Sequence, residues 1–339
     1  MSDLVSILIP TYNAEQWIKE TIESALNQTW SKKEIIIVND GSSDNTLQVI
    51  KKFESKIVKV ITQENMGGPA ARNTALSAAQ GDYIQWLDHD DLLAPDKISK
   101  QIGYSRDNQN PLTLFSGSFG QFYYCRKRAR FVRSALWQDL TPLNYFMIKF
   151  KENIWFQPGA WLVSRKLTEV AGPYYELRSP DDDGEYFCRI VANCEKIVFV
   201  PEAKAYWRVG NLGSMSNNRS NEALTALFTS ISRSIDHFLS LEDSQRTRTA
   251  CLQYLQNRIW HFYPEQQEIL AKAKTLANGL GGNLILPPDE GRKFSLIMNV
   301  AGWKTAMYLR SIVNRTETSF FKNMDRFLYK AGFFKSDSF

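Results

Sequence analysis

The chain has 339 residues, 43% hydrophobic and 23% charged, which predicts a soluble globular protein with one large domain and an appendage, or with two domains. No stretch reaches the roughly 18 consecutive apolar residues of a membrane span, and no signal-peptide pattern opens the chain. Four cysteines without C-x-x-C spacing indicate reduced thiols in a cytosolic protein. With three scattered histidines, they argue against a structural zinc site.

The net charge of +5 is unevenly distributed. Residues 291–339 hold nine Lys and Arg and three acids, a net +6, so the rest of the chain is close to neutral. A basic end on a near-neutral body predicts an anionic partner, either a membrane surface or a nucleic acid.

The first hundred residues alternate strand and helix patterns, and from residue 112 the pattern loosens into shorter strands. The expected strands are 5–9, 34–39, 57–62 and 83–87, followed by the shorter strands 112–115, 119–124, 160–163, 197–200 and 203–208. Helices are expected from about residue 14, from residue 44, up to about residue 81, and around 183–191. Repeated β-α units predict an α/β fold with a parallel sheet and helices on both faces.

A polar linker at 217–220 is followed by helical patterns without intervening strands. Helices are expected at about 221–240, 246–260 and 264–278. The sequence therefore predicts a sheet domain over residues 1–216 and a helical region over residues 217–339.

Four polar loops follow the first four strands. They are Pro10–Asn13, Asp40–Asp44, Asn65–Asn73 and Asp88–Asp91. Because the carboxyl ends of parallel strands meet at one sheet edge, the loops are expected to converge. The loops supply hydrogen-bond donors and acceptors for a nucleotide base, backbone amides at helix starts, an arginine, and carboxylates for a metal ion. There is neither a Walker lysine nor a G-x-G-x-x-G pattern, so a P-loop nucleotidase and a dinucleotide dehydrogenase are not indicated.

Asp88 and Asp90 end the apolar run 83–87. Side chains alternate along a strand, so both are expected on one side and His89 on the other, in packing or in a hydrogen bond to a neighbour. Two hard oxygen ligands at an open edge suit Mg²⁺ or Mn²⁺ bridging a substrate's phosphates. For a D-x-D triplet alone, turn or helix-capping aspartates are the alternative.

Taken in order, these motifs resemble those of glycosyltransferase family 2, with the GT-A fold, over roughly residues 4–215. The resemblance implies a Rossmann-like, mixed but mainly parallel sheet with a helical C-terminal appendage. It places these residues at the nucleotide: Pro10, Thr11 and Tyr12 at the base, Asp40 at the uracil ring, Gly67, Arg72 and Asn73 beside them, and Asp88 near the ribose. It implies that Asp90, with Asp88, carries Mn²⁺ or Mg²⁺. Asp91 matches an extra acid of the family, and opening the next turn is its alternative role.

A second acidic cluster, Asp181–Asp183, is similar to the family's Glu-Asp motif, in which an arginine follows six residues after the aspartate. Counting back from Arg189 places the catalytic base at Asp183, with Asp182 as the second candidate where the family usually has glutamate. Helix capping is the alternative role for one of these three acids, but it does not explain three in succession. Arg208 resembles an arginine near the diphosphate, and a surface arginine is the alternative.

The resemblance implies an inverting hexosyl- or N-acetylhexosaminyltransferase, in the cytoplasm, that moves a sugar from a nucleotide-diphosphate donor, with UDP favoured, to a glycan or lipid-linked glycan acceptor in surface polysaccharide synthesis. Two rivals stay open. A nucleotidyltransferase would carry a Gly-rich loop with Arg and Lys after the first strand, which Pro10–Asn13 lacks. A non-catalytic scaffold that binds sugar nucleotides would not need both Asp90 and Asp183.

Aromatic residues alternate with basic ones in the last fifty positions. For residues 291–339 this pattern suggests a helix on the anionic inner face of the cell membrane. Packing on the catalytic domain or in a homodimer is the equal alternative, and nucleic acid is not expected because no binding motif accompanies the charge. The basic stretch 126–130 is interpreted as a solvated loop or as a surface for an anionic acceptor or membrane.

Overall fold

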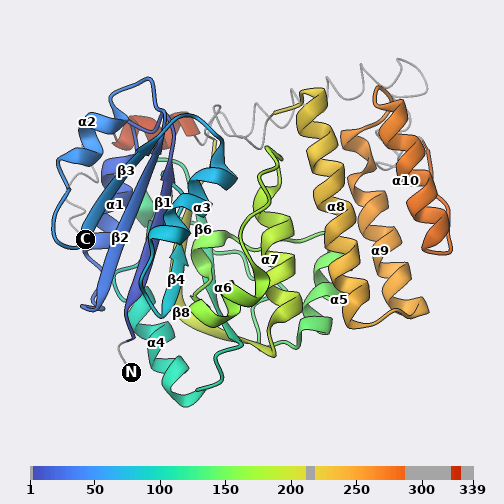
Figure 1. Ribbon diagram of the computed structural model, residues 1–339, viewed down its shortest axis with the longest axis horizontal. Helices are drawn as coiled ribbons and strands as arrows, with labels where there is room; N and C mark the ends of the chain where they lie inside the picture. The colour runs from blue at the N-terminus through green and yellow to red at the C-terminus, as the bar shows by residue number, and fades with distance from the viewer. Residues whose placement is uncertain (1–2, 211–217, 287–321, 330–339) are drawn as a thin grey trace.

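A five-stranded sheet forms the centre of the amino-terminal half (Figure 1). The computed structural model describes residues 3–210, 218–286 and 322–329. The strand order is β3-β2-β1-β4-β7, with β7 antiparallel to β4 and the others parallel. The strands are β1 (Val5–Thr11), β2 (Lys33–Asp40), β3 (Val58–Gln63), β4 (Tyr83–Trp86) and β7 (Val163–Ser164).

All seven residues of β1 are buried, because the sheet is covered on both faces. Helix α3 (Gly68–Ala78) packs across β1 and β2, and α1 (Ile18–Leu26) packs against α2 (Thr46–Lys51). The expected fold class, an α/β protein with a mainly parallel sheet, is confirmed.

A second sheet of three strands has the order β5-β8-β6. Its strands are β5 (Leu92–Leu93), β6 (Thr113–Phe122) and β8 (Lys196–Arg208). The sequence predicted two short strands in place of β6 and two in place of β8, and this is wrong. The pairing shifts between Gly117 and Ser118 of β6, so residues 201–203 of β8 bulge out. A bulge accommodates Pro201 within a continuous strand.

The first helix begins at Ile18, four residues later than expected. Asn13 does not cap it, because this residue has φ of 46° and its Oδ1 accepts from the backbone N–H of Ser43 at 2.8 Å. The remaining helices of the amino-terminal two thirds are α4 (Lys97–Asp107), α5 (Pro142–Glu152), α6 (Arg165–Ala171) and α7 (Asp182–Asn193).

Three helices, α8 (Asn221–Leu241), α9 (Gln245–Arg258) and α10 (Gln267–Gly279), lie side by side at the far end of the molecule (Figure 1). The expected helical region is present, and α8 and α9 pack on α5 and α7 so that one hydrophobic core runs through both halves. The domain boundary at 216/217 stays a prediction, since residues 211–217 lie outside the described part.

Of the basic C-terminal tail, the structure describes only residues 322–329, a helix drawn in red in Figure 1. This helix packs on the amino-terminal half of the protein. For these eight residues, packing was the alternative to a membrane-bound helix. Across the described residues, no helix is both long and apolar enough to span a bilayer.

Candidate active site

The loops after β1 and β2 are tied together at the carboxyl edge of the sheet, as expected. Asn13 N–H donates to Ser42 Oγ at 3.0 Å, and Ala14 N–H donates to Thr46 Oγ1 at 2.7 Å. Pro10 and Thr11 are buried at the end of β1, whereas the side chain of Tyr12 is 45% exposed beyond it. An exposed ring at this edge is placed where a flat base could stack on it.

Asp40 ties the β2 loop to the β3 loop. Its buried carboxylate accepts from Gln63 Nε2 at 2.8 Å, from Met66 N–H at 2.9 Å and from Gly67 N–H at 2.8 Å. Gly67 has φ of 95°, a conformation that glycine adopts without strain. The sequence did not predict this loop-holding role, and the role of Asp40 at a uracil ring stays a prediction.

Arg72 joins the two acidic clusters that the sequence placed on either side of one site. Its guanidinium lies 2.9 Å from Asp88 Oδ1, 2.8 Å from Asp182 Oδ2 and 3.4 Å from Asp183 Oδ1. Arg72 projects from α3 and is buried, with Tyr174 against its guanidinium. Asp88 of the first cluster therefore meets Asp182 and Asp183 of the second, and a buried arginine that bridges them is what the motif analysis missed.

The environment shifts the pKa of these groups. Burial raises the pKa of Asp183 well above its usual range, partly opposed by Arg72 and reinforced by the charges of Asp182 and Asp88. Burial likewise raises the pKa of Asp182, again opposed by Arg72. The three carboxylates raise the pKa of Arg72 against its own burial, so this side chain stays cationic. A carboxylate with a raised pKa is a stronger proton acceptor once it is ionised.

Tyr174 is a further residue of this group that the sequence did not indicate. Its hydroxyl donates to Asp183 Oδ1 at 3.3 Å, and its ring stacks on Tyr186 with centroids 3.7 Å apart. Asn73 holds the Tyr174 backbone through two hydrogen bonds of 2.9 and 2.8 Å. Asn73 thus positions the segment that carries Tyr174, a placement that only long-range packing reveals.

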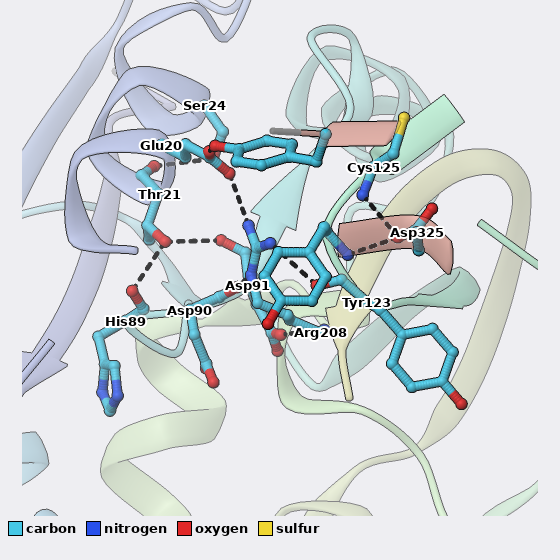
Figure 2. Close-up of polar contacts among 12 residues, drawn as sticks. Glu20, Thr21, Ser24, His89, Asp90, Asp91, Tyr123, Cys125, Arg208 and Asp325 are labelled. Atoms are coloured by element: carbon cyan, nitrogen blue, oxygen red, sulfur yellow. Dashed lines mark hydrogen bonds and ion pairs between the residues drawn. The ribbon is translucent and has the colours of Figure 1, made fainter. Parts of the chain in front are cut away.

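The Asp88–Asp91 loop differs from the expected strand end. Strand β4 ends at Trp86, and residues 89–90 form a turn, so the argument from strand alternation is wrong. The loop is instead held from α1, where Thr21 Oγ1 donates to the carbonyls of His89 at 2.9 Å and Asp91 at 3.0 Å (Figure 2).

Asp91 is buried behind the loop and faces away from the site. Its carboxylate accepts from Arg208 N–H at 2.7 Å and from Gln157 Nε2 at 2.5 Å. Burial, followed by the charges of Asp90 and Asp88, raises the pKa of Asp91 well above its usual range. These contacts support the structural alternative for Asp91 over a catalytic one.

Arg208 is also engaged within the protein. It is 4% exposed, and its guanidinium donates to Glu20 Oε2 at 2.7 Å and to the carbonyls of Asp90 at 2.8 Å and Tyr123 at 3.2 Å. These bonds use three of the five guanidinium N–H groups, so the expected contact with a diphosphate stays a prediction. The alternative of a surface arginine is wrong, because the side chain is buried.

The site holds more carboxylates than cationic side chains. Three carboxylates share the single guanidinium of Arg72, and burial, which raises the pKa of Asp182 and Asp183, opposes full ionisation of all three. The Asp90 side chain points away from Arg208 (Figure 2), and within the described residues no cluster of three or more metal-ligating side chains occurs. One or two carboxylates completed by phosphate oxygens is the ligand set that Mg²⁺ prefers in such sites.

Comparison with known proteins places this arrangement in a family. The family model "Glycosyl transferase family 2" matches residues 6–170. An uncharacterized glycosyltransferase of Haemophilus influenzae is 30% identical over 228 residues, 65% of this chain and 85% of that protein. A poly(ribitol-phosphate) beta-glucosyltransferase of Bacillus spizizenii is 39% identical over 116 residues, 32% of this chain and 18% of that longer protein.

The fold is similar to that of a protein of known structure. Residues 1–349 of S. aureus TarS, crystallised with UDP-GlcNAc, superpose with a TM-score of 0.57 at 18% identity, covering 82% of this chain and 90% of that one. Together with the motif order and the junction of the two acidic clusters, these matches show that the chain belongs to glycosyl transferase family 2.

Proposed function

We propose that this protein is a metal-dependent, inverting glycosyltransferase that moves one hexosyl or N-acetylhexosaminyl unit from a nucleotide-diphosphate sugar, UDP-linked in our assignment, to a glycan or lipid-linked glycan of the cell surface. The observation that carries the proposal is the junction at Arg72, which places Asp88 and Asp183 around one guanidinium. The name of the poly(ribitol-phosphate) relative and the UDP-GlcNAc bound to TarS support the acceptor and donor classes.

In this mechanism, Asp183 accepts the proton of the acceptor hydroxyl while that oxygen attacks the anomeric carbon from the face opposite the leaving group. One such displacement inverts the anomeric centre. Tyr174 and Arg72 orient the Asp183 carboxylate through their contacts with its Oδ1. A cation held by Asp90, with Asp88, would stabilise the charge that develops on the departing diphosphate.

The test is a thermal-shift screen of UDP-, GDP- and dTDP-sugars with and without Mn²⁺, because a ligand that binds the native state raises the melting temperature. We expect a Mn²⁺-dependent shift with a UDP-sugar. The Asp90→Ala variant should lose the Mn²⁺ dependence, and Asp107→Ala, an exposed aspartate at the end of α4, should keep it.

A wild-type Mn²⁺ response in Asp90→Ala would remove Asp90 as a ligand. Binding of the donor without sugar transfer to any acceptor would instead indicate a scaffold that binds sugar nucleotides. Release of pyrophosphate from a nucleoside triphosphate and a sugar phosphate would indicate a nucleotidyltransferase.

A further inference from the structure

The C-terminal helix, residues 322–329, is attached to the edge of the active site by a buried carboxylate. Asp325 is 3% exposed, and its Oδ2 accepts from the backbone N–H groups of Tyr124 at 2.7 Å and Cys125 at 3.0 Å (Figure 2). Its Oδ1 lies 3.1 Å from Arg128, in the basic stretch that follows β6. A buried carboxylate with three donors anchors the helix specifically.

The last described residue of this helix reaches α1. The hydroxyl of Tyr329 donates to Glu20 Oε1, and its ring lies against that of Tyr124 with centroids 5.9 Å apart. Burial and the hydrogen bond to Glu20 raise the pKa of Tyr329 to about 12, so the hydroxyl keeps its proton and remains a donor.

Glu20 passes this contact on to the aspartate loop. Its other oxygen, Oε2, accepts from Arg208 at 2.7 Å, and Arg208 Nε donates to the Asp90 carbonyl at 2.8 Å. The Arg208 guanidinium is sandwiched between Trp17 and Phe122, whose ring centroids lie 4.0 and 4.5 Å away. The two rings and the hydrogen bond from Glu20 together fix the direction in which Arg208 donates to the Asp90 carbonyl, so loss of the Glu20 contact removes one of the restraints on the loop.

We propose that Glu20 and Tyr329 are positioning residues, through which the C-terminal helix sets the geometry of the Asp88–Asp91 loop. The expected consequence for donor binding at Asp90 rests on the proposed function. The chain of contacts from Tyr329 to the loop does not. A purely structural counter-ion role for Glu20 would change the stability of the whole protein without a selective effect on the loop.

The experiment compares Tyr329→Phe and Glu20→Gln with matched controls. Tyr329→Phe removes one oxygen and keeps the ring on Tyr124; its control is Tyr104→Phe, an exposed tyrosine on α4. The control for Glu20→Gln is Glu23→Gln on the same helix, an acid whose ion pair with Lys19 is solvent-exposed. Two quantities are measured on the full chain: hydrogen exchange of the amides of residues 87–93, and affinity for UDP with Mn²⁺.

We expect the amides of residues 87–93 to exchange about tenfold faster in both variants than in their controls. UDP should bind about tenfold more weakly, because each variant loses one charge-assisted hydrogen bond. In transfer assays the KM for the donor should rise more than kcat falls. For Tyr329→Phe the global unfolding midpoint should match that of Tyr104→Phe, which excludes a general loss of stability.

Exchange and affinity equal to those of the controls in both variants would overturn the proposal. If Glu20→Gln fails to fold, Tyr329→Phe alone decides, since it deletes a single hydroxyl. If the wild-type protein binds no nucleotide, the proposed function fails, whereas the exchange measurement needs no ligand and still tests the contact chain.

Discussion

At the scale of single residues, Asp182 and Asp183 differ in what their oxygens do. Asp182 accepts the backbone N–H of Asp183 on one oxygen and contacts Arg72 on the other, and its side chain is 12% exposed. The Asp183 side chain is 25% exposed, and its contacts with Arg72 and Tyr174 are both made by Oδ1. An oxygen that faces the open site is required of a proton acceptor, so the geometry favours Asp183.

We predict that Asp183→Asn lowers kcat by about 10²–10⁴-fold, the contribution of a general base, with little change in donor affinity. Asp182→Asn keeps an oxygen for Arg72 and is expected to lower kcat much less. Transfer rates with saturating donor, together with donor affinity by calorimetry, check both. Loss of transfer in Asp182→Asn with activity retained in Asp183→Asn would reverse the assignment.

At the scale of elements, α4 places a lysine in the core, and no carboxylate among the described residues pairs with it. Lys97 is fully buried, and its Nζ donates to the Trp161 carbonyl at 2.9 Å and to Gln85 Oε1. Burial lowers the pKa of Lys97 well below its ordinary value. These contacts fix the start of α4 against β4 and against residues 158–161. That segment directly follows Gln157, whose side chain donates to Asp91.

A lowered pKa makes stability depend on pH. Between the folded pKa and the ordinary lysine pKa, the unfolded chain binds more protons than the folded one, so stability rises as the pH increases through this window. We predict that Lys97→Met loses this rise, whereas Lys100→Met, one turn later and partly exposed, retains it. Urea unfolding at neutral and at mildly alkaline pH measures the difference, and parallel pH profiles for wild type and Lys97→Met would contradict it.

At the scale of the whole molecule, the helical region is part of the catalytic unit. Phe238 of α8 stacks on Phe146 of α5 with centroids 5.0 Å apart, and Phe150 stacks on Tyr254 of α9 at 4.0 Å. Arg258 of α9 lies 3.1 Å from Asp181, at the start of the helix that carries Asp183. The helices therefore support the position of the candidate base.

We predict that Phe238→Ala lowers the unfolding free energy of the whole protein by about 3–5 kcal/mol, the usual cost of deleting a buried aromatic ring. Urea unfolding followed by far-ultraviolet and near-ultraviolet circular dichroism should show one shifted transition. Phe327→Ala, at a side chain that is 68% exposed, is the control. A separate early transition confined to the helical region would show instead that the two halves unfold independently.

The order of the β-α units and the polar loops at the strand ends could be predicted from the sequence, because hydrophobic periodicity and the geometry of parallel strands are local properties. The family motifs pointed to Asp88 and Asp183, which lie around Arg72, whereas the role of Asp90 as a metal ligand stays a prediction. Strand ends were predicted less well, as at Trp86 and Pro201, because turns and bulges depend on the partner strand rather than on the strand's own pattern.

Only the tertiary structure decided which charges meet. Arg72 faces Asp182 across 110 positions of the chain, and Tyr329 meets Glu20 across 309. No periodicity encodes such pairs, since each depends on how separate elements pack. For the same reason, the burial of Arg208, and the burial that raises the pKa of Asp183, follow from the packed interior alone.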